Sequence, residues 1–363
     1  MSFTIVKANI IYNNYADLNS ITDNANKWNN KLEKIKISYH DNGRSGENVL
    51  WNLSNIDIDT ANVEISHVYC NSTKDTIECN ENNTTYRYLY RNNSLWLIGV
   101  ENRLTKIDYD ECEEYQTIPV VYGDSISGYY HGRGSYCDKI ILRSFGHYKT
   151  IADAKGILIL PTGDTIQNVT RLYTKRQIYT KFFPTDSLIN KEFKSLNNDS
   201  LPLLIAKQKN PQVMDIYRWY AKDSKYPILE TYALYNENTL IGRVAYYISQ
   251  DTMSTSGNLF ENNQKHKARK EQYLVQKESN VCYNISQETT NIIKLDYSIS
   301  TNSIVSYGLY TVDGKTIFFQ PSQYVNKGIF SQQINIPIKN KKGVYVFVIT
   351  VNDKRYTSKI EMR

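Results

Sequence analysis

The chain has 363 residues and a formal net charge of +6, and 40% of its residues are hydrophobic against 22% charged. This length predicts two or three domains that each bury a core, with a composition ordinary for a folded protein. No run of eighteen apolar residues occurs, so a transmembrane helix is not expected. The start, MSFTIVKANIIYNNYADL, also lacks the long apolar core of a secretory signal peptide.

Short strands separated by turns are predicted from the beginning of the chain. Residues 36–39 form a first short strand, and the apolar run 49–53 predicts a second one that buries Trp51. Two further strands lie within 86–100, on either side of Asn92-Asn93, which is a natural hairpin turn.

The five cysteines contain no CxxC pair, which argues against a zinc site or a thioredoxin-like motif. If the chain is exported, Cys70 and Cys79 are candidates to bridge a hairpin, and Cys112 and Cys137 for a second disulfide. The fifth, Cys282, has no candidate partner. Five unpaired thiols are the alternative.

Acidic residues cluster just after the first hairpin, at Asp108, Asp110, Glu111, Glu113 and Glu114. Glycosidase chemistry needs two carboxyl groups that face each other across a cleft, which sequence neighbours on one loop do not provide. We therefore predict a solvated acidic loop, with a weak Ca²⁺ site as the alternative.

The best candidate for a catalytic constellation is formed by Asp124, His131, Arg133 and Cys137. A cysteine and a histidine that meet in space make a thiolate nucleophile. Six residues of extended strand, however, separate His131 from Cys137 by about 20 Å. A turn with an exposed histidine is the favoured interpretation.

Glycines at 128, 132 and 134 raise the possibility of a phosphate-binding loop, which requires a strand that leads into a helix. A strand over 140–145 follows instead, so these glycines are predicted to serve β-turns or bulges. Since HExxH, GxSxG and Walker A sequences are also absent, the sequence predicts no catalytic, cofactor or metal site.

The rest of the body continues in the same way, with a hairpin formed by 156–160 and 168–173. Helices are predicted only at Asp186–Leu196 and, more weakly, at Lys265–Gln276. Residues 250–290 are polar and interrupt the strand rhythm, which is typical of a linker. We therefore predict a β-rich, sandwich-like body over 1–249, a linker over 250–290 and a separate domain over 291–363.

The last 72 residues predict a small β-sandwich. Apolar residues alternate with polar ones along 293–299, and a second strand covers 304–311 before the hairpin signal Asp313-Gly314. Alternation returns at 334–338, and 343–351 is apolar on both faces, as in a strand between two layers. A last strand covers 355–361. Several short strands in so short a segment are typical of an immunoglobulin-like sandwich.

This tail resembles the C-terminal sorting domain of proteins that Bacteroidota export through type IX secretion. The resemblance covers roughly the final fifth of the chain and includes the basic residue Arg363 at the end. Its motif positions are Asp313, Gly314, Lys315, Lys342, Gly343, Tyr345, Ile349 and Lys359. It implies recognition by the type IX machinery. A generic immunoglobulin-like or fibronectin-like module is the alternative.

Charge also sets this tail apart. Residues 292–363 contain ten Lys and Arg against four Asp and Glu, so they account for the whole net charge of +6 and leave the body neutral. The lysines at 339, 341 and 342 are too few and too local for a nucleic-acid interface, and a solvated loop is the plain interpretation.

Three elements of the body are similar to stretches of uncharacterised Bacteroidota surface proteins. They are GRSGENVLWNLS from Gly43, ADAKGILILPTGDTIQNVTR from Ala152, and YRWY with YPIL from Tyr217 and Tyr226. Asn52 stands where such proteins more often have Asp. This resemblance implies a shared fold and no established activity.

Together these features predict an exported, non-enzymatic surface or secreted protein that binds an unknown protein or glycan. Type IX cargo also needs a leader to cross the inner membrane, so the given start implies a processed or truncated chain. The alternatives are an exported hydrolase of unrecognised type and a cytosolic protein with a C-terminal immunoglobulin-like module.

Overall fold

The computed structural model describes residues 30–56, 65–73, 75–184, 200–222, 224, 226–248, 281–336 and 342–362. These residues form strands almost throughout, with one six-residue helix, so the predicted mainly-β class is confirmed. In chain order the elements are β1 (Asn30–Ile37), β2 (Gly46–Asn52), β3 (Ile65–Thr73), β4 (Thr76–Glu81), β5 (Thr84–Arg91), β6 (Ser94–Asn102), β7 (Thr105–Thr117), β8 (Ser125–Tyr136), β9 (Ile140–Ile159), β10 (Thr165–Pro184), α3 (Leu201–Ala206), β11 (Gln212–Tyr220), β12 (Leu229–Asn236), β13 (Thr239–Ile248), β14 (Val281–Thr289), β15 (Ile292–Ile299), β16 (Ser303–Thr311), β17 (Thr316–Val325), β18 (Gly328–Asn335), β19 (Gly343–Val351) and β20 (Lys354–Met362).

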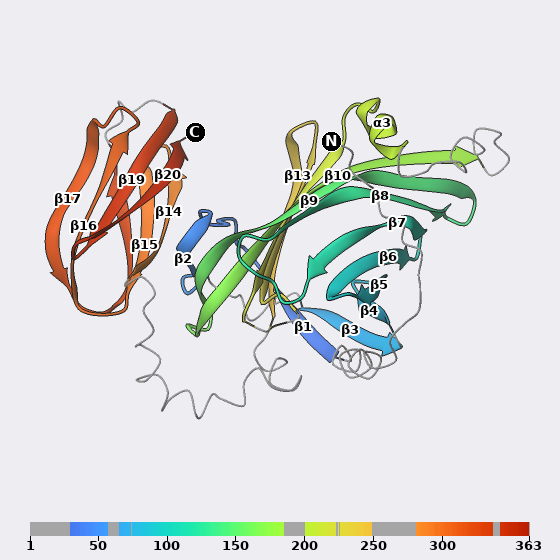
Figure 1. Cartoon of the computed structure of the whole chain (residues 1–363), viewed down its shortest axis with the longest axis horizontal. Coiled ribbons are helices and arrows are strands. Elements are labelled where there is room, and N and C mark those ends of the chain that lie inside the picture. The colour runs from blue at the N-terminus through green and yellow to red at the C-terminus, as the bar shows by residue number, and fades with distance from the viewer. Residues whose placement is uncertain are drawn as a thin grey trace, which may run out of the picture.

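The body is built from one antiparallel sheet that closes on itself. Each strand from β3 to β9 pairs with the next, and the order continues through β10, β11, β12 and β13 to β1, which pairs with β3. The closing pair is β9 with β10, whose registers match from Thr165 opposite Ile159 to Pro184 opposite Ile140. Figure 1 shows the long β8, β9 and β10 crossing above the shorter β3 to β7. We call these twelve strands the closed sheet.

Asparagine turns set the register of several hairpins. Asn92 and Asn93 both have positive φ, as do Asn82 and Asn83. Two consecutive residues with positive φ form the tight turn whose twist matches that of the flanking strands, and asparagine tolerates this conformation better than most residues. The hairpin predicted at Asn92-Asn93 is confirmed.

The lower end of the closed sheet encloses an apolar core. Leu32 on β1, Ile77 on β4 and Leu95 on β6 are each less than 5% exposed. Along β1 and β6, buried residues mostly alternate with less buried ones, so one face of each strand points inward and the other outward.

Among the described strands, β2 is the one that pairs with both the body and the C-terminal unit. It pairs parallel with the end of β9, where Trp51 lies opposite Leu158. On its other edge it pairs parallel with β14 through Val49 and Tyr283. Figure 1 shows β2 between the closed sheet and the orange and red C-terminal strands.

The C-terminal unit, residues 281–362, is a two-layer sandwich. One layer contains β14, β15 and β18, and the other contains β17, β16, β19 and β20 in that order. Its core includes Leu295, from the predicted alternating strand, and Phe347 and Ile349, each 0% exposed. Along 343–351, predicted to be buried on both faces, only every second residue is fully buried. Three strands facing four is an arrangement of immunoglobulin-like sandwiches.

The predicted linker boundary needs correction, and the two predicted helices fall on residues that the structure does not describe. The predicted linker 250–290 extends too far, because residues 281–289 form β14 and contribute Val281 and Tyr283 to the C-terminal core. The polar residues of this strand face outward or bond across the junction, which is why composition alone suggested a linker. Both predicted helices lie outside the described residues, and α3 was not predicted.

Candidate functional site

The predicted catalytic constellation does not come together. Strand β8 is continuous from Ser125 to Tyr136, so His131 and Cys137 remain about 20 Å apart along one extended segment. Cys137 lies in the exposed turn that follows, with a positive φ of 52°. Asp124 lies just before the opposite end of the strand. The three groups therefore share no site.

His131 is buried rather than exposed, contrary to the prediction of an exposed histidine in a turn. Its imidazole Nδ1 lies 3.8 Å from the Asp110 carboxylate, and Arg133 approaches the same carboxylate at 3.4 Å. Burial and the nearby Arg143 guanidinium lower the pKa of His131, and Asp110 opposes them. His131 is therefore a buried, neutral imidazole between charged neighbours, and its role is structural.

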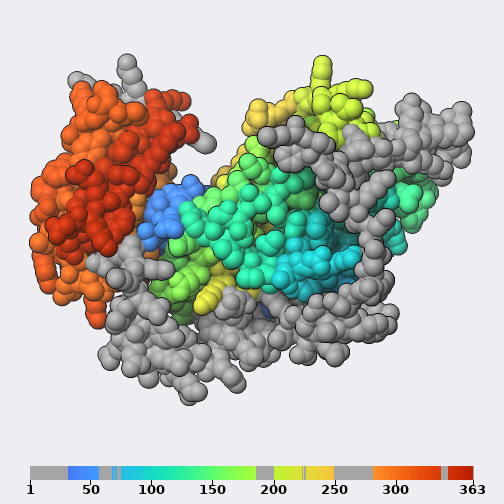
Figure 2. All heavy atoms as spheres, in the orientation of Figure 1, coloured from blue at the N-terminus to red at the C-terminus, as the bar shows by residue number. Residues whose placement is uncertain are grey.

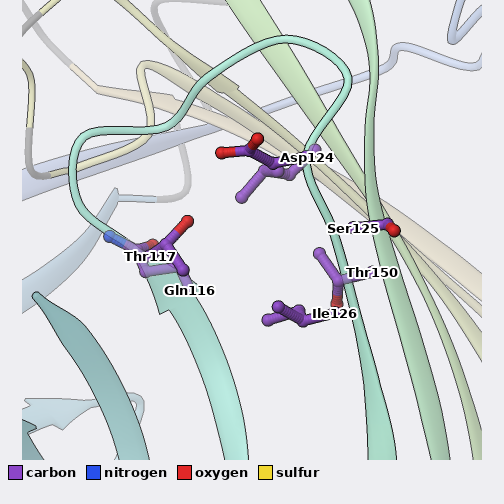
Figure 3. A pocket seen from close by; sticks show the side chains of 7 residues that line it. Gln116, Thr117, Asp124, Ser125, Ile126 and Thr150 are labelled. Carbon is purple, nitrogen blue, oxygen red and sulfur yellow. The ribbon is translucent and has the colours of Figure 1, made fainter. Parts of the chain in front are cut away.

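Asp124 borders a cavity of only about 10 Å³, which Figure 3 shows from close by. Gln116 and Thr117 line it from the end of β7, and Ile126 and Thr150 line it from β8 and β9. A volume of this size holds about one water molecule and no substrate. The backbone of Asp124 has a structural role, because its carbonyl accepts a hydrogen bond of 2.8 Å from the amide of Ala152.

The five clustered carboxylates lie along strand β7, not on a solvated loop. Asp108 pairs with Arg87 on β5, and Glu113 pairs with Arg176 on β10 at 2.8 Å. Glu114 accepts a hydrogen bond from Ser94 at 2.6 Å. The loop prediction was wrong because four of these five carboxylates contact a side chain on another strand, which composition does not reveal. Among the described residues, no three His, Cys, Asp or Glu side chains are placed to hold a metal ion.

The glycines of β8 serve close backbone approach rather than turns. A Cβ atom on Gly134 would lie 1.6 Å from the carbonyl oxygen of Lys106 on the paired strand β7. Only glycine fits such a position, so the interpretation as turns was wrong, and a neighbouring irregularity appears instead as a register shift in β7 between Tyr109 and Glu111.

One of the two candidate disulfides is formed. Cys70 on β3 and Cys79 on β4 are bonded across neighbouring strands. Cys112, Cys137 and Cys282 form no disulfide among the described residues. The second pairing was therefore wrong: Cys112 lies on β7, with its thiol against the Tyr109 carbonyl, and Cys137 lies in the turn beyond β8.

The interior of the closed sheet contains a buried charge network that the sequence did not predict. The Lys34 ammonium lies 2.7 Å from the Glu230 carboxylate and 2.9 Å from that of Glu81. Arg218 approaches the other oxygen of Glu230 at 3.6 Å. Burial alone would lower the pKa of Lys34, but the two carboxylates outweigh it and hold that pKa above its ordinary value.

Tyrosine rings inside the closed sheet pack against the buried guanidinium groups. The Arg218 guanidinium lies 4.0 Å from the ring centroid of Tyr115, which comes from β7 on the opposite side of the closed sheet. Arg176 lies 4.3 Å from the ring of Tyr130 in the same way. Burial raises the pKa of Tyr115 to about 12, so this phenol is neutral. The charges balance within the interior, which is typical of a structural network.

A second buried arginine, Arg171 on β10, joins the three sequence elements that resemble stretches of surface proteins. Its guanidinium makes a two-point contact with Asp153, at 2.9 and 2.8 Å, from the element that begins at Ala152. It also donates to the carbonyls of Asn42 and Gly43 and lies 6.0 Å from the ring of Trp219. We call this group the Arg171 junction.

The same junction explains Gly43 and Trp51. A Cβ atom on Gly43 would lie 2.7 Å from the indole nitrogen of Trp51, and its φ of 74° also favours glycine. The indole donates to the Asn42 carbonyl at 2.9 Å, and its ring packs edge-on against Trp219. Because Arg171 and both tryptophans are at most 2% exposed, the junction stabilises the fold and these three side chains are not accessible to a ligand.

Next to this junction, Arg44 fastens the C-terminal unit to the body. Its Nε donates to the Tyr283 carbonyl at 3.1 Å, and its guanidinium stacks 4.0 Å from the Tyr283 ring. Asn284 adds two bonds, because its side chain accepts from the Arg44 amide and donates to Asp41. Figure 2 shows the blue atoms of this segment in contact with the C-terminal unit.

Most of the predicted sorting positions lie toward one end of the C-terminal unit, whereas Ile349 lies further along β19, opposite Tyr307 and Tyr356. Thr311, which precedes the Asp313-Gly314 turn, pairs with Tyr345 on β19, and Gly343 pairs with Met362. The Gly314 amide donates to the Thr311 carbonyl at 3.0 Å, as a tight turn requires. A hydrogen bond from Thr311 lowers the pKa of Asp313.

These positions divide into a buried set and an exposed set. Tyr345 and Ile349 belong to the core, whereas Lys315, Lys342 and Lys359 are exposed. The contacts to Arg44 lie at residues 283–284, about 17 Å along β14 from its end at Thr289, which lies at the same end as the motif. The body therefore leaves this end of the unit open.

A scan against models of protein families finds no match to the chain, and a search of curated proteins finds no similar sequence. Among the described residues, no helix has the length and apolar character needed to cross a bilayer. The functional argument consequently rests on the geometry.

Proposed function

We propose that the chain is an exported, non-enzymatic protein of Bacteroidota whose C-terminal unit is a type IX sorting domain and whose body binds a protein or glycan. The observation that carries the proposal is the grouping of Asp313, Gly314, Lys315, Lys342, Gly343 and Lys359 at one open end of a compact seven-strand sandwich. A secretion machinery that reads this end meets exposed cations there, away from the cargo.

The disulfide supports the export part of this proposal. Bonds such as Cys70–Cys79 persist in oxidising compartments and are rare in reducing ones. The cytosolic alternative would require the same two thiols to stay reduced at adjacent positions of paired strands.

The binding role is supported by the pairing of the body's buried ionisable groups with one another, which leaves them no catalytic role. Charged residues of the interior pair with one another, and the cavity beside Asp124 holds about one water molecule. A larger depression of about 320 Å³ between β1 and β13 is lined by no acidic residue. A hydrolase requires convergent groups beside a space for substrate. Within the described residues, a recognition surface on the outside of the closed sheet fits this arrangement better.

The test is delivery of a reporter. A fluorescent protein with a cleavable N-terminal leader is fused to residues 281–363 and expressed in a Bacteroidota strain with type IX secretion and in a derivative lacking the translocon. We expect surface-exposed reporter in the first strain and periplasmic reporter in the second. The fusion begins before Val281, because a cut at residue 291 would remove β14 from the core.

A matched variant sharpens the test. Lys359→Glu changes an exposed cation of the motif end, whereas Lys327→Glu makes the same charge change elsewhere in the unit, between β17 and β18. We expect weaker delivery only for the first. Equal delivery in both strains, or none in either, would contradict the sorting role.

A further inference from the structure

Strand β13 has a free edge at the rim of the closed sheet. It pairs with β12 from Tyr247 to Thr239, but its other edge meets β1 only from Ile248 to Ala245. Beyond that point β1 ends and the chain turns away. Among the described residues, the stretch 239–244 has no strand partner on this side. Its amides and carbonyls are therefore available to another extended chain.

The space beside this edge is open. Leu240 is 46% exposed and Ile241 is 60% exposed. A Cβ atom on Gly242 would have no neighbour within 4 Å. Figure 1 shows the tip of the β12–β13 hairpin projecting from the top of the body. Long apolar side chains on an unpaired edge favour pairing with an added strand.

A depression of about 320 Å³ lies where β1 and β13 separate, and we call it the fork. Three of its lining side chains are basic: Lys36 from β1, His40 just beyond it, and Arg243 from β13. The other lining residues are Ile37, Ser38, Val244 and Ala245, and none is acidic. Within the described part of the chain, the Arg243 guanidinium makes no ion pair. The fork therefore favours a carboxylate.

We propose that the free edge of β13 binds an extended, acidic segment of a partner protein, which adds as a strand along residues 239–244 and places a carboxylate in the fork. Main-chain hydrogen bonds would hold the segment along the edge, and its side chains would contact Leu240 on one face and Ile241 on the other. Charge complementarity with Arg243 selects an acidic occupant over a neutral or basic one.

This inference does not depend on export. The C-terminal unit contacts the body through β2 and Arg44, on elements other than the free edge, so sorting and strand addition can fail separately.

The test uses a fluorescein-labelled peptide of alternating valine and glutamate, about eight residues long, which exceeds the free stretch slightly. Its affinity for the full chain is measured by fluorescence anisotropy at low salt, against a valine–lysine peptide of the same length. We expect binding of the acidic peptide only. Arg243→Glu should weaken it about tenfold, whereas Arg103→Glu, in the exposed β6–β7 turn, should change it less than about twofold.

Hydrogen exchange identifies the mode of binding. Strand addition protects amides within 239–244 when the acidic peptide is present, and the Arg243→Glu variant loses this protection at the same peptide concentration. Equal binding of both peptides, or tight binding without protection of 239–244, would overturn the proposal. So would self-association of the chain, seen by sedimentation, that Arg243→Glu abolishes, because the edge would then be occupied by a second copy.

Discussion

The body and the C-terminal unit are both made mainly of antiparallel strands, but the side chains that fill their interiors differ. The C-terminal unit has an apolar core in which residues such as Leu295, Phe347 and Ile349 alternate with outward-facing ones. The body adds to its apolar core two networks of buried charge, one around Lys34 and Glu230 and one around Arg171. Strands of the same kind can therefore enclose different interiors. In the larger sheet, buried ion pairs between strands form part of the interior.

The reason lies in the size of the enclosed space. Two facing layers of three and four strands are filled by one set of apolar side chains. A closed sheet of twelve strands has a wider interior, which long side chains such as Lys34, Arg176 and Arg218 span, with aromatic rings packed between them. Buried charges of this kind require partners, because an isolated buried charge is strongly destabilising.

The largest expected effect breaks the network around Glu230. Glu230→Gln removes the carboxylate that lies between Lys34 and Arg218, whose side chains are nearly fully buried. We expect a loss of about 3–5 kcal/mol in the free energy of unfolding of the body, because two cations lose a common partner. Urea unfolding followed by tryptophan fluorescence measures it, since all four tryptophans belong to the body.

The control for that variant is an exposed pair. Glu101→Gln removes a carboxylate 3.2 Å from Lys106, and both side chains are about half exposed. We expect a change below about 1 kcal/mol. Equal losses for the two substitutions would show that the buried charge network contributes no more to the free energy of unfolding of the body than an exposed ion pair.

The second effect concerns the disulfide, which the C-terminal unit lacks. Replacing Cys70 and Cys79 together by serine opens a link between residues nine positions apart. We expect a loss of about 2–3 kcal/mol, confined to the unfolding transition of the body. Cys112→Ser is the matched control, because that thiol is free. A shift in the C-terminal transition instead would contradict this assignment.

A smaller effect is expected at the contact between the two regions. Arg44→Ala removes the bond to the Tyr283 carbonyl and the stacking on its ring. We expect a loss of about 1–2 kcal/mol and, in calorimetry, a wider separation between the transitions of the body and the C-terminal unit. Transitions that stay equally coupled in the variant would show that β2–β14 pairing alone joins the regions.

The smallest expected effect is on the pH dependence of stability. The pKa of His131 is lowered from 6.5 mainly by burial, and additionally by the charge of Arg143. The unfolded chain therefore takes up a proton first as the pH falls through 6.5, and the folded state loses stability. His131→Gln should show a shallower loss between about pH 7 and pH 5 in thermal unfolding curves. An unchanged slope would show that His131 does not contribute.

The difference between the two interiors also explains which parts of the structure can be predicted from the sequence. Period-two alternation predicted the strand containing Leu295, because a half-buried strand shows its inner face in the spacing of its apolar side chains. The strand containing Phe347 was predicted instead from its continuous apolar run, and only every second residue of it is fully buried. Local turn chemistry predicted the hairpin at Asn92-Asn93 and the turn at Gly314. Both signals are carried by residues close together in the sequence.

The charged interior carries no such signal. Glu113 appeared to be part of an acidic loop, and its partner Arg176 lies more than sixty residues further along the chain. The Arg171 junction combines residues from β9, β10, β11 and the segment before β2. The quoted stretches around Asp153, Arg171 and Trp219 pointed to this site, but only the fold shows that they meet.

The central claim is that residues 281–363 direct the chain to the cell surface while the body remains the cargo. Protease accessibility on intact cells of a type IX-competent Bacteroidota strain tests it most directly, with the full chain compared to a chain that ends before Val281, both behind the same leader. We predict that the full chain is cleaved from outside and that the shortened chain is protected in the periplasm. Equal cleavage of the two chains would contradict the account.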